Sequence, residues 1–207
     1  ELEPENPAHR RDYAEFLVKQ NEPDFALGLL NQHPDEATTA LLALRYPELR
    51  EQTEEVTQAL DKVISRRTLP ELASRYVGES DNFKAAEYAF EQKKYNLASD
   101  FIHKALDEHP NDIEIIRLAA KIDQRLANLD EAIESSALLA MFEPENKTNN
   151  RELARLYQQT QQETKALEVY QDLIFDQDQV DREDFLNYSE IAIKAGKPEL
   201  AIPIAEG

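Results

Sequence analysis

The chain has 207 residues and a formal net charge of −19, which results from 42 acidic and 23 basic residues. Its hydrophobic content of 41% excludes an intrinsically disordered chain despite this charge. Because the acidic surplus repels nucleic-acid phosphates and anionic membranes, we do not expect nucleic acid as a partner.

The absence of cysteine excludes disulfides and thiolate zinc sites. Both the bacterial periplasm and the cytoplasm tolerate this absence, so the compartment stays open. No apolar run approaches the roughly 18 residues of a membrane span, and we expect no direct membrane insertion of this segment. Only 4 glycines accompany 10 prolines, which favours helices joined by tight turns over sheets with glycine hairpins.

Residues 1–34 are predicted to hold the tail of a preceding repeat and one short helix pair. Apolar residues recur at helical spacing over 7–20, and the turn sequence NEPD then leads into a second helix that contains Phe25 and Leu29. The string LEPEN near the start of the chain resembles FEPEN at 142–146, where it closes one repeat. We therefore expect the chain to be a fragment of a longer solenoid.

Residues 35–80 are predicted to form a degenerate helical repeat region. A helix is expected over 35–46, and Pro47 is expected to open the first turn of a long following helix. The repeat register slips here by a few residues, and the extra length is assigned to a short additional helix between Pro70 and Gly78.

Residues 81–207 are predicted to form regular helix pairs, the last of them truncated. The expected pairs are 82–92 with 95–108, 112–126 with 129–141, 150–160 with 163–174, and 182–194 with 198 to the end.

Small residues repeat along this regular region with a period of about 34. Early in the second helix of each pair stand Ala98, Ala132, Ala166 and Ala201, at steps of 34, 34 and 35 residues. The first helices carry a matching set: Ala86, Ala120, Ala154 and Ser189. This period, with helix-turn-helix composition, is typical of stacked helical arrays, in which small side chains let neighbouring helices approach closely.

On these residues the chain resembles the tetratricopeptide repeat family. The resemblance implies an all-α fold, a right-handed superhelical solenoid of about five to six helix pairs. It also implies a protein-interaction scaffold, which binds a protein or peptide segment along the concave groove made by the first helix of each pair.

Five basic residues are expected to gather on two adjacent first helices of this acidic chain. Because residues four apart on a helix lie nearly above one another, they form two rows on the inner face. The candidate partner-binding residues are Arg117, Lys121, Arg125, Arg151 and Arg155. They suggest recognition of an acidic peptide segment or a chain-terminal carboxylate. The alternative is a solvated helix face whose charge is balanced by Glu114 and Glu152.

Catalysis and cofactors are not expected from this sequence. It has no glycine-rich phosphate loop, nucleophile elbow or HExxH motif, and no catalytic residue, metal ligand or cofactor is assigned. Two alternatives to a general scaffold remain open. One is the periplasmic repeat array of a bacterial exopolysaccharide exporter or envelope assembly, and the other is a self-assembly module that associates through uncovered apolar ends.

Overall fold

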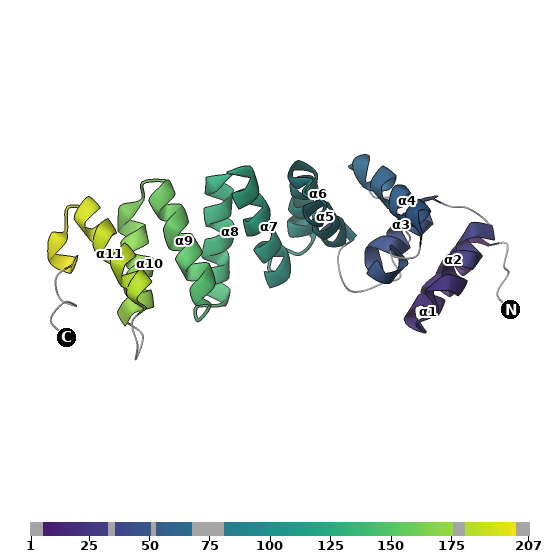
Figure 1. Ribbon diagram of the computed structural model, residues 1–207, viewed down its shortest axis with the longest axis horizontal. Coiled ribbons are helices and arrows are strands. Elements are labelled where there is room, and N and C mark those ends of the chain that lie inside the picture. The colour runs from purple at the N-terminus through teal and green to yellow at the C-terminus, as the bar shows by residue number, and fades with distance from the viewer. Residues whose placement is uncertain (1–5, 33–35, 51–52, 68–80, 176–180, 202–207) are drawn as a thin grey trace. The chain divides into compact units, whose positions relative to one another are not determined.

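The structure, a computed structural model, describes residues 6–32, 36–50, 53–67, 81–175 and 181–201. Within these ranges every regular element is a helix: eleven α-helices and two short 3-10 helices (Figure 1). This confirms the predicted all-α, tetratricopeptide-like fold of helical hairpins. By their contacts the residues divide into two compact units, Glu1–His109 and Pro110–Gly207.

The Glu1–His109 unit contains three helix pairs, and the partners of each pair contact one another. The pairs are α1 (Pro7–Lys19) with α2 (Pro23–Gln32), α3 (Glu36–Arg45) with α4 (Glu54–Ser65), and α5 (Asp81–Glu91) with α6 (Tyr95–Glu108). The helix α3 also contacts α5. The Arg45 guanidinium fastens these two helices, since its Nε and Nη2 each donate to an Asp81 carboxylate oxygen at 2.7 Å.

The prediction of one long helix from Pro47 is wrong. Pro47–Leu49 forms only a 3-10 turn, η1, and α4 starts separately after Thr53, whose hydroxyl accepts from Val56 N at 3.4 Å. At the end of this turn the Arg50 guanidinium donates to the carbonyl oxygens of Ala43 and Leu44 in α3. The additional helix predicted between Pro70 and Gly78 lies outside the described residues.

Tyr88 of α5 lies at a polar junction inside this unit. Its side chain is buried, its hydroxyl donates to Asp61 Oδ1 at 3.1 Å, and the Arg50 guanidinium lies 4.9 Å from the ring centroid. Burial, together with the Asp61 carboxylate, raises the pKa of Tyr88 from 10.0 to about 12.

This pKa predicts an alkaline limit for the unit. The folded chain favours the neutral phenol of Tyr88. Its contribution to the free energy of unfolding is therefore complete below pH 10.0 and is lost as the pH rises toward 12. We expect unfolding titrations to show a steep fall in stability over this window, and the variant Tyr88→Phe to show a shallower one. Subtracting the ultraviolet phenolate titration of the variant from that of the wild type isolates Tyr88. A midpoint near 10 in that difference would contradict the prediction.

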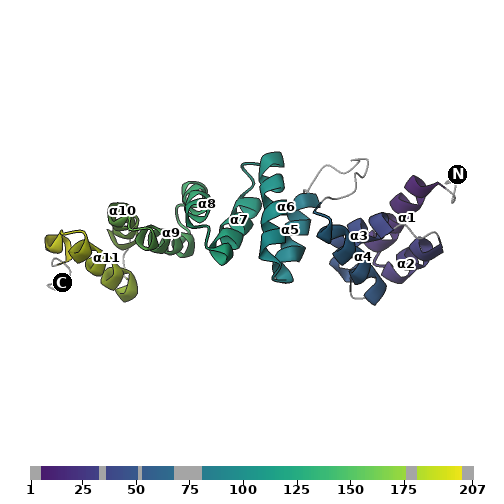
Figure 2. The same ribbon diagram turned by 90° about the horizontal axis from the view of Figure 1, so that it is seen from above.

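Within the Pro110–Gly207 unit the helices follow one another in the predicted order (Figures 1 and 2). It contains α7 (Ile113–Leu126), α8 (Leu129–Phe142), α9 (Lys147–Gln159), α10 (Glu163–Phe175), α11 (Arg182–Lys194) and the 3-10 turn η2 (Pro198–Ala201). Successive helices from α7 to α11 contact one another. The helix α9 begins at Lys147, three residues before the predicted start, because the Asn146 side chain caps it by accepting from Asn149 N at 3.2 Å.

The same caps and turns recur along the regular region. Asp112, Asn146 and Asp181 cap the first helices α7, α9 and α11 with their side chains. The turns between paired helices place one residue in the left-handed backbone region, and these residues are Lys93, Ala127, Gln161 and Gly196. Caps and turns therefore follow the same period as the alanines.

Six of the eight predicted small residues are buried, namely Ala86, Ala98, Ala120, Ala132, Ala154 and Ala166. The other two, Ser189 and Ala201, are only partly buried. In the last hairpins, Ala154 and Ala166 share a core cluster with Tyr170 and Tyr188. Because these side chains are short, the helices of a pair pack closely. This packing fixes which side chains of the first helices point to solvent.

Candidate partner-binding site

The five basic residues predicted to bind a partner lie on α7 and α9. Arg117, Lys121 and Arg125 belong to α7, and Arg151 and Arg155 belong to α9. The structure separates them into two kinds, because three of the arginines engage carboxylates of the same unit and the other two side chains do not.

Arg117 holds the loop that follows α8. Its Nη2 donates to Glu143 Oε1 at 2.8 Å, and a carboxylate oxygen of Glu114 lies 3.6 Å away. Asn146 donates its side-chain amide to the other Glu143 oxygen at 2.9 Å. The hydrogen bonds from Asn146 and Arg117 hold the pKa of Glu143 below its ordinary value, so this carboxylate is ionised at neutral pH.

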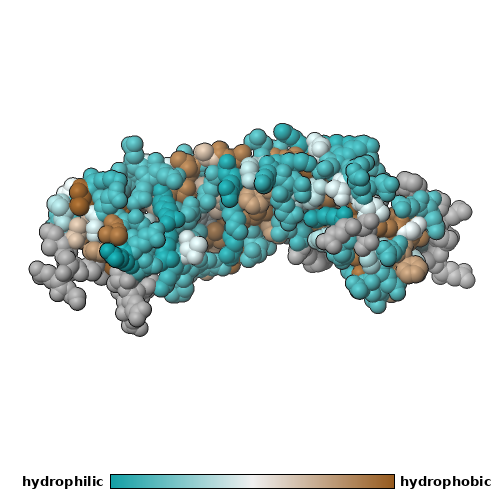
Figure 3. Space-filling model, in the orientation of Figure 1, coloured by the Kyte–Doolittle hydropathy of each residue, from teal (hydrophilic) through white to brown (hydrophobic). Residues whose placement is uncertain are grey.

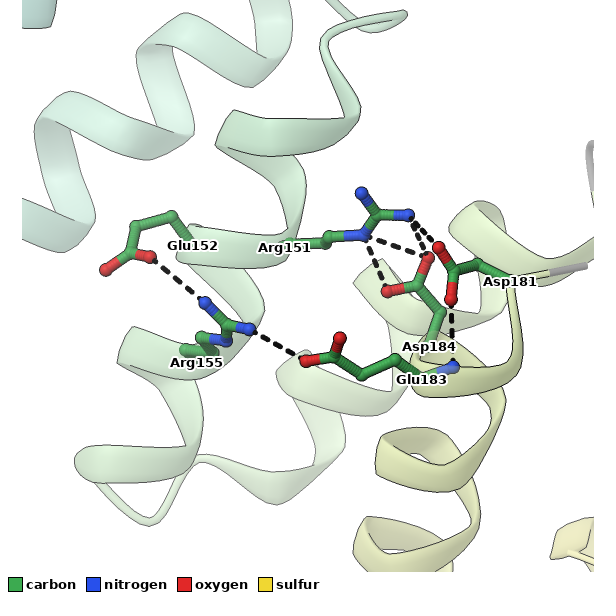
Figure 4. Close-up of polar contacts among 6 residues, drawn as sticks. All are labelled: Arg151, Glu152, Arg155, Asp181, Glu183 and Asp184. Carbon is green, nitrogen blue, oxygen red and sulfur yellow. Dashed lines mark hydrogen bonds and ion pairs between the residues drawn. The ribbon is translucent and has the colours of Figure 1, made fainter.

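Arg151 joins α9 to the start of α11 (Figure 4). Its Nε and Nη2 donate to the two oxygens of Asp184, both at 2.7 Å, and Nη2 also lies 3.0 Å from Asp181 Oδ2. The Asp184 side chain is only 2% exposed. The hydrogen bonds to Asp184 raise the pKa of Arg151, and the pair forms a structural link rather than a surface for ligands.

Arg155 lies one turn farther along α9 in a more exposed pair (Figure 4). Its Nη2 donates to Glu183 Oε1 at 3.2 Å, while Nη1 lies 3.8 Å from a Glu152 oxygen. The alternative expected from the sequence, a charge row balanced by Glu114 and Glu152, thus describes part of the geometry. The stronger partners come from Glu143, Asp181, Glu183 and Asp184.

Lys121 and Arg125 are exposed on α7, and neither forms an ion pair or hydrogen bond with any residue the structure describes. Their charges are therefore available to a ligand.

A pocket of about 410 Å³ lies between α7, α8 and α9, and we call it the α7–α9 pocket. Its walls are formed by Arg117, Ala120, Lys121, Gln124, Ser136, Leu139, Asn146, Thr148, Asn149 and Glu152. Eight of these ten residues are polar, but the surface that they and Ala120 and Leu139 expose to the pocket is more apolar than polar. The pocket can therefore take a short chain segment that presents apolar groups beside its polar ones.

Ser136 gives this pocket a hydrogen-bonding floor. Its side chain is 1% exposed, and its hydroxyl lacks a hydrogen-bond partner among the described residues. A buried hydroxyl without a partner is costly, so a ligand that bonds to it is favoured. Neighbouring Asn149 is held in place because its amide donates to the Ser136 carbonyl at 2.9 Å. Ser136, Asn146 and Asn149 were not predicted as site residues, and the only sequence signal for Ser136 is that it interrupts an apolar helix with a polar side chain.

A second cavity, of about 360 Å³, lies between α8, α9 and α10. Its apolar walls include Leu153 and Leu173, and its lining also holds one cation, Lys147, and two carboxylates, Glu145 and Asp172. The rest of the surface is mostly hydrophilic on the face seen in Figure 3, where hydrophobic patches are small.

Two other kinds of feature are absent from the residues that the structure describes. No cluster of three or more histidine, aspartate or glutamate side chains there could hold a metal ion. No described helix is both long and apolar enough to cross a membrane.

Comparison with known proteins supports the fold. No protein-family model matches the chain, and no curated protein matches it. Solved structures do: two crystal forms of MamA AMB-1 superpose with TM-scores of 0.57 and 0.54, each at 20% identity and over 79% of this chain and 94% of that one. A tetratricopeptide repeat protein from Parabacteroides merdae gives 0.45 at 15% identity, over 96% of this chain and 77% of that one, which is too weak to bear on the fold. At these identities the likeness to MamA extends to the fold, a stacked array of helical hairpins.

Proposed function

We propose that the chain is a protein-interaction scaffold that binds an extended segment of a partner protein in the α7–α9 pocket. The observation that carries this proposal is the pairing of an unpaired cation, Lys121, with a buried hydroxyl without a partner, Ser136, in one pocket. Arg117, Arg151 and Arg155 are engaged in ion pairs, whereas Lys121 is not, so the open pocket that holds both Lys121 and Ser136 is the best candidate for recognition.

The chemistry of the pocket favours a carboxylate. The Lys121 ammonium supplies charge, and the Ser136 hydroxyl supplies a donor at the floor. Arg125 lies one helical turn beyond Lys121 and is exposed, so it can contact the same segment farther along. Glu152 also lines the pocket, but its charge is partly offset by Arg155, whose Nη1 lies 3.8 Å away. We therefore assign the first contacts to Lys121 and Arg125, whose charges are unpaired. Arg117 lines the same pocket but is paired with Glu143. Arg151 and Arg155 pair with Asp184 and Glu183 and keep a structural role.

An array of short immobilised peptides tests this function. Each peptide is made with an aspartate or glutamate and again with the matching asparagine or glutamine. We expect the acidic members to bind, and Lys121→Ala to weaken the best of them about tenfold. The matched control is Lys147→Ala, which removes an equal charge from the second cavity and is expected to leave binding unchanged. Equal losses in both variants, or no preference for acidic peptides, would overturn the proposal.

A further inference from the structure

The cationic wall of the α7–α9 pocket already has a carboxylate close to it. Arg117 lines this pocket, and its Nη2 donates to Glu143 Oε1 at 2.8 Å, whereas Glu143 stands outside the pocket walls. Its other oxygen accepts from Asn146 at 2.9 Å, and Asn146 does line the pocket. Two wall residues of the pocket are thus held by one carboxylate that belongs to the chain itself.

We propose that Glu143 is a specificity-determining residue of this pocket, an internal carboxylate that competes with the acidic group of the partner for Arg117. This inference rests on the function proposed above. Glu143 raises the threshold for binding, so that only a segment able to replace it at Arg117, or to satisfy Lys121 and Ser136 together, is retained.

The burial of the pair makes this exchange feasible. The Arg117 and Glu143 side chains are 29% and 30% exposed, so water and an incoming group reach both. Arg117 also has a donor in reserve, because its Nε is buried without a hydrogen-bond partner in the described part of the chain. A carboxylate that replaces Glu143 at Nη2 gains this Nε as a second donor, in the forked geometry that arginine favours. The Arg151–Asp184 pair contrasts with this one, since Asp184 is only 2% exposed and cannot exchange so readily.

The expected gain in affinity on removing the Glu143 charge is small, because partly exposed ion pairs are weak. Because Glu143 competes for Arg117, the measured affinity for an acidic segment is the intrinsic affinity multiplied by the fraction of molecules in which Arg117 is free. For an ion pair this exposed, the state in which Arg117 and Glu143 are paired is only a few times more populated than the state in which they are apart. Removing the Glu143 charge should therefore tighten binding of an acidic segment about three- to sixfold.

The variant Glu143→Gln tests this. Glutamine retains an oxygen that can accept from Asn146, so the loop before α9 is preserved while the negative charge is lost. The probes are the tightest-binding acidic peptide from the array and its amide twin, measured by fluorescence anisotropy at several salt concentrations. We expect the variant to bind the acidic peptide more tightly, with a steeper salt dependence, and the amide twin with unchanged affinity.

Glu145→Gln is the matched control, because it removes the same charge two residues away and faces the second cavity. If both glutamine variants tighten binding equally, or if the amide twin gains as much as the acid, Glu143 acts only through net charge or loop structure and the inference is overturned. If the wild type binds the acidic peptide through Lys121 but Glu143→Gln binds no better, the inference fails while the proposed function stands. If no variant binds any acidic peptide, both fail together.

Discussion

Replacement of Phe101 by alanine should lower the free energy of unfolding of the Glu1–His109 unit by about 3–5 kcal/mol. Phe101 lies on α6, is 0% exposed, and is among the largest fully buried side chains of the structure. Its removal leaves a cavity in the hairpin of α5 and α6, where the alanines on both helices are too short to fill it.

Urea denaturation followed by circular dichroism measures this loss, and hydrogen exchange resolved to α5 and α6 localises it. Phe25→Ala provides a matched control in the same unit, since the Phe25 side chain is 70% exposed and its truncation should change stability by no more than about 0.5 kcal/mol. Comparable losses in the two variants would mean that α6 does not bury Phe101 against α5.

Replacement of Arg151 by methionine should destabilise the Pro110–Gly207 unit by about 2–4 kcal/mol. Methionine preserves much of the side-chain volume but leaves the Asp184 carboxylate, 2% exposed, without its forked partner. We place the cost below that of a fully buried pair because Arg151 itself is 30% exposed, and because Asp184 lies in the first turn of α11, where the helix dipole favours a negative charge.

Arg155→Met separates this effect from a general loss of charge. It makes the same substitution one turn along α9, but its partner Glu183 is 72% exposed, so the expected cost is at most about 1 kcal/mol and should disappear in high salt. The loss in Arg151→Met should persist in high salt. Equal costs for the two variants, or full recovery of Arg151→Met by salt, would refute the structural role given to the buried pair.

The sequence predicted the hairpins of the regular region well, because their determinants are local and periodic. Buried alanines such as Ala132 and Ala166 mark each crossing, and all but one of the predicted helix starts there lie within one residue of the observed ones. The exception, α9, is preceded by a polar run in which Asn146 caps the helix, and helical periodicity cannot detect a cap hidden among similar residues. The break after Pro47 was also missed, and there Arg50 donates to the Ala43 carbonyl of α3, a contact between elements that periodicity within one helix cannot detect.

The candidate site could be predicted only in part. Helical spacing correctly placed Lys121 and Arg125 on α7 with exposed charges. Spacing within one helix could not predict that Arg117, Arg151 and Arg155 form ion pairs with carboxylates of other segments, which lie 26 to 33 residues away in the sequence. The sequence could not predict that the Ser136 hydroxyl lacks a hydrogen-bond partner, because a serine in an apolar helix usually bonds to its own backbone. In the structure this hydroxyl is buried and has no partner among the described residues.

The left-handed turns of the hairpins have a consequence for engineering. Lys93, Ala127 and Gln161 adopt φ values of 57°, 58° and 57°, where a Cβ atom is crowded by the backbone, and Gly196 adopts 72° without that crowding. The three corners at Lys93, Ala127 and Gln161 thus store a little steric strain that contributes to neither the core nor the pocket. Thermal tolerance could be redesigned at these corners while every surface that a partner would touch is left as it is.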